Sequence, residues 1–181
     1  FDRSHRFSFQ ELKKYPLEIV IEYLKHTHHS FIKHRLPYIA RLVNQYPTHD
    51  DLQLIFPEFI EEFINHIYEE EDTIFSYIST LIDFQKGKYV NPQFFQLEYG
   101  DLSLKTIHKE HKEEDELAGI RALIEESQIT DLHRQVIAKE IKAFDREMWY
   151  HAEIENKIFF PKAIALEAVV KEKINKLSKL N

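Results

Sequence analysis

The chain has 181 residues, of which 43% are hydrophobic and 30% charged, with a formal net charge of −7. This size predicts one globular domain, and the acidic balance argues against general binding to nucleic-acid phosphates. Cysteine is absent, which excludes disulfides and thiolate metal sites, and 3 glycines and 6 prolines provide few turns for a strand-rich fold. No apolar run is long enough to cross a membrane and no leader precedes the domain, so we expect a cytoplasmic protein.

Apolar residues recur every three or four positions through most of the chain, which is typical of amphipathic helices. After an N-terminal arm over residues 1–15, long helices are expected at about residues 17–46, 51–84, 101–127 and 131–160. A loop is expected at residues 85–100, and Pro161 is expected to open a short C-terminal helix. This order predicts an all-α, antiparallel up-down four-helix bundle, with one domain over residues 1–181 and a bundle core at about 17–165.

Histidine is unusually common, with 11 copies, and two of them precede a glutamate by four residues. These pairs are His66 with Glu70 and His151 with Glu155. On a helix, residues four apart share a face, so an imidazole and a carboxylate can reach the same metal ion. Two such pairs alone are little more than chance gives in a chain this rich in histidine and glutamate.

The residues around the two pairs strengthen the signal. Both segments read H-x3-E-x3-[IF]-F, ending at Phe75 and Phe160. His29 lies 37 residues before His66, and His111 lies 40 residues before His151. The chain therefore reads as two helical hairpins, each with a histidine on its first helix and a His-x3-Glu pair on its second.

Folded antiparallel, these helices bring four imidazoles and two carboxylates together, a set that suits a pair of transition-metal ions. Burying two ionised carboxylates without metal would be very costly, and the alternative is a solvated helix face. The spacing leaves the metal open, since zinc and manganese accept similar ligands. The predicted ligands are His29, His66, Glu70, His111, His151 and Glu155.

Four motifs over residues 17–165 resemble the hemerythrin-like family of helical di-iron proteins, and most closely its bacterial iron–sulfur cluster repair branch, also called repair of iron centres. They are His28-His29 with Leu36-Pro37, His66-x3-Glu70 with Ile74-Phe75, His111-x3-Asp115-Glu116-Leu117, and His151-x3-Glu155-Asn156 with Phe159-Phe160-Pro161. The resemblance implies two iron ions with an oxo or hydroxo bridge. It implies the four predicted histidines as terminal ligands and both glutamates as bridging carboxylates.

The chain departs from the family pattern in two places. A fifth histidine usual in the family would fall at Asp50, so His49 and His108 are the candidates for an extra ligand. The repair proteins often carry a cysteine-bearing N-terminal segment, which this chain lacks, and this argues against thiol-assisted iron delivery. His26, His28 and His34 are interpreted as surface residues or as supports for a ligand, and His133 as an exposed residue near a helix N-terminus.

The resemblance implies a protein of nitrosative or oxidative stress that binds or reacts with NO or O2, in repair of iron–sulfur centres. Its partners would be a small diatomic molecule and a damaged iron–sulfur protein, with no nucleic acid and no membrane. One alternative is a reversible O2 binder, or a sensor of O2 or iron, without turnover. Another is a helical partner-binding domain whose metal is structural. Whether the protein is an enzyme stays open at this point.

Overall fold

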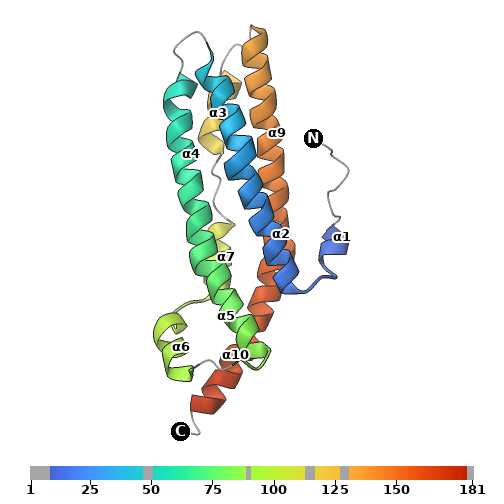
Figure 1. Cartoon of the computed structure of the whole chain (residues 1–181), viewed down its shortest axis with the longest axis vertical. Helices are drawn as coiled ribbons and strands as arrows, with labels where there is room; N and C mark the ends of the chain where they lie inside the picture. Colours follow the sequence, from blue (N-terminus) through green and yellow to red (C-terminus); the bar gives the residue numbers. More distant parts are fainter. Residues whose placement is uncertain (1–8, 47–50, 89–90, 113–116, 127–130, 179–181) are drawn as a thin grey trace. The chain divides into compact units, whose positions relative to one another are not determined.

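The computed structural model describes residues 9–46, 51–88, 91–112, 117–126 and 131–178. These residues form helices and no strand, which confirms the all-α prediction for this part of the chain. Figure 1 shows the helices in the colours of the sequence. Three of the elements below (η2, η3 and η4) are π-helical. In chain order the elements are α1 (Phe9–Leu12), α2 (Leu17–Ser30), η2 (Phe31–Arg35), α3 (Leu36–Asn44), α4 (Asp51–Glu69), η3 (Glu70–Phe75), α5 (Ser76–Gln85), α6 (Pro92–Tyr99), α7 (Leu104–His111), α8 (Ala118–Glu126), α9 (Leu132–Ile154), η4 (Glu155–Phe159) and α10 (Phe160–Ser178).

The first two predicted helices are confirmed as the uninterrupted runs α2–η2–α3 and α4–η3–α5. The predicted loop at residues 85–100 is partly wrong, because it contains α6, which Asn91 caps by accepting hydrogen bonds from the backbone N–H groups of Gln93 and Phe94. The predicted third helix is two helices, α7 and α8. The fourth runs through η4 into α10 without a break, so Pro161 opens no separate helix.

Proline explains where two of the π-helical segments lie. The backbone N–H of Leu36 donates to the carbonyl of Phe31, and that of Phe160 donates to the carbonyl of Glu155. Each donor precedes a proline, Pro37 or Pro161. Because proline has no N–H and its ring clashes with the carbonyl four residues earlier, a wider turn just before it lets the helix continue.

Contacts divide the chain into two compact units. Unit 1 comprises residues 1–23, 70–113 and 153–181, and unit 2 comprises residues 24–69 and 114–152. The prediction of one domain over residues 1–181 stays a prediction.

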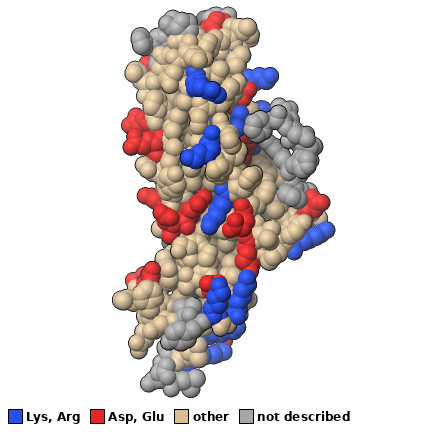
Figure 2. All heavy atoms as spheres, in the orientation of Figure 1, with Lys and Arg blue, Asp and Glu red and all other residues tan. Residues whose placement is uncertain are grey.

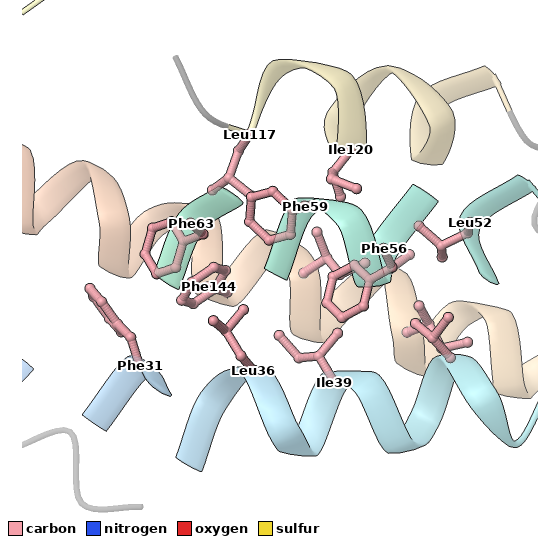
Figure 3. Close-up of a cluster of buried hydrophobic side chains, with 14 of the residues drawn as sticks. Phe31, Leu36, Ile39, Leu52, Phe56, Phe59, Phe63, Leu117, Ile120 and Phe144 are labelled. Atoms are coloured by element: carbon pink, nitrogen blue, oxygen red, sulfur yellow. The ribbon is translucent and has the colours of Figure 1, made fainter. Parts of the chain in front are cut away.

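Unit 2 is organised around an aromatic and aliphatic core, drawn in Figure 3. Its residues come from the η2–α3 run, α4, α8 with the preceding Leu117, and α9. Phe144 packs edge-on against Phe31 and Phe63, with ring centroids 5.2 and 5.7 Å apart. Because these rings are nearly inaccessible to water, their burial is the main force that holds the helices of this unit together.

Unit 1 packs α10 against α5, α6 and α7. Its interior contains a buried acid, Glu167 of α10, which is 7% exposed. The Glu167 carboxylate accepts hydrogen bonds from the Tyr77 hydroxyl at 2.9 Å and from the Leu104 backbone N–H at 3.3 Å, and Lys171 lies 3.3 Å away. This carboxylate therefore ties α5 and the first turn of α7 to α10.

The surface carries both signs of charge. On the face drawn in Figure 2, Lys and Arg side chains lie among Asp and Glu side chains. Within the described part of the chain, no helix has the combined length and apolar content that a membrane span needs.

Candidate metal site

Four buried side chains place metal-ligating atoms close together: His28, Glu70, His151 and Glu155. One ligand atom from each lies within 4.8 Å of the other three. Their exposed fractions are 2%, 4%, 5% and 1%. Two imidazoles and two carboxylates thus form one buried group of nitrogen and oxygen donors.

The two histidines of the group meet through their ring nitrogens. The Nε2 atoms of His28 and His151 lie 3.0 Å apart, and the Phe31 ring packs edge-on against His151 at 5.7 Å between centroids. Without a metal, one Nε2–H donates to the other nitrogen. Two nitrogens bound at right angles to one ion, each about 2.1 Å from it, would also lie about 3.0 Å apart. The observed spacing therefore fits two ligands of one metal ion.

Glu155 also faces a third histidine. The Nε2 atom of His111, on the last turn of α7, lies 3.0 Å from Oε2 of Glu155, and the His111 side chain is 15% exposed. The Phe160 ring lies beside His111 at 5.7 Å between centroids. His111 therefore extends the donor set at the Glu155 carboxylate.

The two glutamates occupy matching positions in their helices. Glu70 is the first residue of η3 and Glu155 is the first residue of η4. The H-x3-E-x3-[IF]-F repeat therefore corresponds to a structural repeat, in which an α-helical turn with the histidine runs into a π-helical turn that begins at the glutamate. Such π-helical turns are frequent at functional sites.

The structure places some of the predicted ligands in or beside this group and others outside it. The structure brings Glu70, His151 and Glu155 together and sets His111 against Glu155. His29 lies outside the group: it is exposed, and its ring packs edge-on near His34 at 6.2 Å between centroids. The neighbouring His28, interpreted above as a surface or supporting residue, takes its place, because one residue turns a helix by about 100° and changes the face.

The remaining candidates lie outside the four-residue group. His66 is half-buried, one turn before Glu70 on α4. His108 has its Nε2 at 2.9 Å from the side-chain oxygen of Asn156. His49, Asp115 and Glu116 lie outside the described residues.

Comparisons with models of protein families, with curated proteins and with solved structures give no match to this chain. The resemblance noted in the sequence therefore depends on the motifs quoted for it.

The chemistry of the donor set fits a metal ion. Imidazole nitrogen and carboxylate oxygen together suit iron, zinc or manganese. Two carboxylates in one buried group repel each other and lose hydration, so a cation between them would offset a large cost. The group of His28, Glu70, His151 and Glu155 can accordingly hold a metal ion.

Proposed function

We propose that this chain is a non-haem di-iron protein of the hemerythrin-like type, which binds or reacts with O2 or NO. The observation that carries the proposal is the buried group of two histidines and two glutamates whose ligand atoms lie within 4.8 Å of one another. The proposal includes an antiparallel four-helix bundle, of which the all-α fold is the part already established.

His28, His151, Glu70 and Glu155 would hold the ions. His111, 3.0 Å from Glu155, is proposed as a fifth ligand, and His66 is proposed as the sixth from its place one turn before Glu70. The two glutamates are proposed as the bridging carboxylates. Two ions in such a set retain open coordination positions, and ferrous iron when bound supplies electrons and a place for a diatomic molecule.

The protein's own residues would hold the ligands and restrict water. Phe31 packs against His151, and Phe160 lies beside His111. Both rings are buried, with exposed fractions of 3% and 0%. Apolar walls lower the local dielectric and admit an uncharged diatomic molecule more readily than an ion.

The biological purpose is proposed from the resemblance as the repair of iron–sulfur centres under nitrosative or oxidative stress. One observation favours a second candidate, a reversible O2 binder or a sensor of O2 or iron. None of the 181 residues is a cysteine, so this part of the protein carries no thiol with which to pass iron to a damaged cluster.

The first test is elemental analysis of the full chain purified without added metal, where we expect two iron ions per chain. A protein that contains no transition metal and binds none on addition would refute the proposal. The second test exposes the reduced protein to O2 and to NO and follows its visible spectrum. A spectrum that reverses on degassing favours the O2 binder, whereas sustained NO consumption or reactivation of a damaged iron–sulfur enzyme favours repair.

A further inference from the structure

Two histidines on the last turn of α7 face two consecutive residues of η4. His111 meets Glu155, and His108, three residues earlier, meets Asn156, with Nε2 2.9 Å from Oδ1. A side-chain amide oxygen only accepts hydrogen bonds, so the His108 Nε2–H donates. The two contacts attach α7 to the π-helical turn that begins at Glu155.

The ring of His108 is also fixed from one face. It stacks on Phe160 with centroids 4.6 Å apart and planes inclined by only 16°. Phe160 is fully buried, so it is a rigid support. The hydrogen bond and the stacking together leave the His108 ring little freedom, and they set the position of the helical turn that carries His111.

The start of α7 is held as well. The Leu104 backbone N–H, in its first turn, donates to the buried Glu167 carboxylate. This helix of 8 residues is therefore attached at both ends within unit 1. An isolated helix this short is marginal in water, so the position of His111 depends on these attachments.

We propose that His108 is a positioning residue that holds His111 against Glu155 through Asn156 and Phe160. His108 lies outside the group of four metal-ligating side chains, and its Nε2 atom faces the neutral amide of Asn156 and not a carboxylate of that group. This departs from the prediction of His108 as an extra ligand. The proposal rests on the proposed function in one respect: the consequence of the positioning is measured as metal affinity at His111 and Glu155.

The test titrates the full-length, metal-free protein with Co²⁺ alone and follows the visible cobalt spectrum and the competition with a chelator. We expect His108→Ala to weaken Co²⁺ binding about 10- to 100-fold, the usual effect of removing a group that orients a ligand. His108→Gln, whose amide N–H can still donate to Asn156, should recover most of the affinity. His108→Phe, which retains only the stacking, should not recover it.

His34→Ala is the matched control, since His34 is an exposed histidine, and it should bind Co²⁺ as the wild type does. Wild-type affinity and spectrum in His108→Ala would overturn the proposal. The proposal would also be overturned if His108→Gln bound Co²⁺ as weakly as His108→Ala and each variant bound one ion fewer per chain, because His108 would then be a ligand.

A second measurement does not depend on metal. In the metal-free protein, ¹⁵N NMR of the histidine rings should show the proton of His108 on Nε2, and His108→Ala should accelerate hydrogen exchange of the α7 amides. If the wild type binds no metal, the proposed function fails while this measurement still decides whether His108 holds α7. Unchanged exchange in α7 would refute the positioning role.

Discussion

Two parts of this molecule bury glutamate side chains, and they surround them differently. Glu167 lies among donors supplied by the protein, namely the Tyr77 hydroxyl, the Leu104 backbone N–H and the Lys171 ammonium group. Glu70 and Glu155 lie in a group with His28 and His151. The first arrangement places hydrogen-bond donors of the protein around one carboxylate, whereas the second places four side chains that can ligate a metal within 4.8 Å of one another.

The difference separates a structural acid from a binding acid. A carboxylate that accepts several hydrogen bonds is stable when buried and ties together the elements that donate them. Carboxylates grouped with imidazoles concentrate acceptor atoms and negative charge, which a bound cation would offset. Burial alone therefore says little about function, and the surrounding donors decide which role a buried glutamate has.

The largest expected effect comes from neutralising the acids of the metal group. Glu155→Gln and Glu70→Gln should each weaken metal binding by more than about 100-fold, since the loss of a ligand exceeds the 10- to 100-fold loss typical of a supporting residue. Glu167→Gln should leave metal binding unchanged. Metal content after dialysis against a chelator, measured by elemental analysis, checks all three variants.

Stability measurements on the same variants sharpen this contrast. In metal-free protein at pH 7, Glu70→Gln should change the free energy of unfolding less than Glu167→Gln does, because it also relieves the repulsion between two neighbouring buried carboxylates. Glu167→Gln should lower it, because the amide weakens the interactions with Tyr77, Leu104 and Lys171. If both substitutions lower the free energy of unfolding of the metal-free protein equally in urea denaturation, the surroundings of Glu70 and Glu167 do not differ in the way proposed here.

The next largest effect distinguishes two adjacent histidines. His28→Ala should lose metal affinity to a degree similar to the glutamate variants, while His29→Ala should retain wild-type affinity. The substitutions are identical in chemistry and lie one residue apart on α2, so each is the control for the other. Equal metal retention in both variants would mean that this helix contributes no imidazole to the site.

The sequence could not predict which of these two adjacent histidines belongs to the metal group. The His-x3-Glu pairs and the matching residues after them located Glu70, His151 and Glu155, because positions four apart share a helix face. They did not locate a place for His66, which lies outside the four-residue group. No such pair marks the first helix. There, His28 and His29 differ only by a rotation of about 100°, and the sequence pattern does not resolve so small a difference.

Some of the helices, like some of the site residues, could be predicted from the sequence and others could not. The runs over residues 17–44 and 51–85 were predictable because their apolar residues repeat regularly over many turns. The π-helical turns were not, although proline two residues after η2 and η4 is a signal for a widened turn that can be sought in other sequences. The separation of α7 from α8 was missed because Leu117 and Ile120 continue the apolar spacing beyond His111.

A smaller effect, the pH dependence of stability, tests the hydrogen bond that the Tyr77 hydroxyl donates to Glu167. Burial and the adjacent Glu167 carboxylate raise the pKa of Tyr77, whose side chain is inaccessible to water. Below the ordinary tyrosine pKa of about 10, both the folded and the unfolded forms are neutral and the full stability is present. Above it only the unfolded form ionises, so the free energy of unfolding should fall by about 1.4 kcal/mol per pH unit.

Tyr77→Phe isolates this contribution. The variant should be less stable than the wild type at pH 8, because it lacks the hydrogen bond to Glu167. Since it cannot ionise at position 77, the gap should narrow as the pH rises from 9 to 12. Urea denaturation at each pH measures the difference in the free energy of unfolding. A constant difference over this range would show that the folded protein does not raise the pKa of Tyr77.

The smallest expected effect concerns a histidine that lies outside the metal group and that we interpret as structural. His133, predicted to be exposed near a helix N-terminus, is half-buried in the first turn of α9, and its Nε2–H donates to the carbonyl of Leu42 at 2.8 Å. His133→Ala should lower the free energy of unfolding by about 1 kcal/mol, the usual contribution of one hydrogen bond. Metal content should stay at the wild-type value, because His133 is not among the four grouped side chains. Loss of metal in this variant would indicate that the stability of the whole fold, and not the ligand side chains, controls how much metal the protein retains. The metal contents of Glu155→Gln and His28→Ala would then have to be compared with that of a non-ligand variant of equal stability.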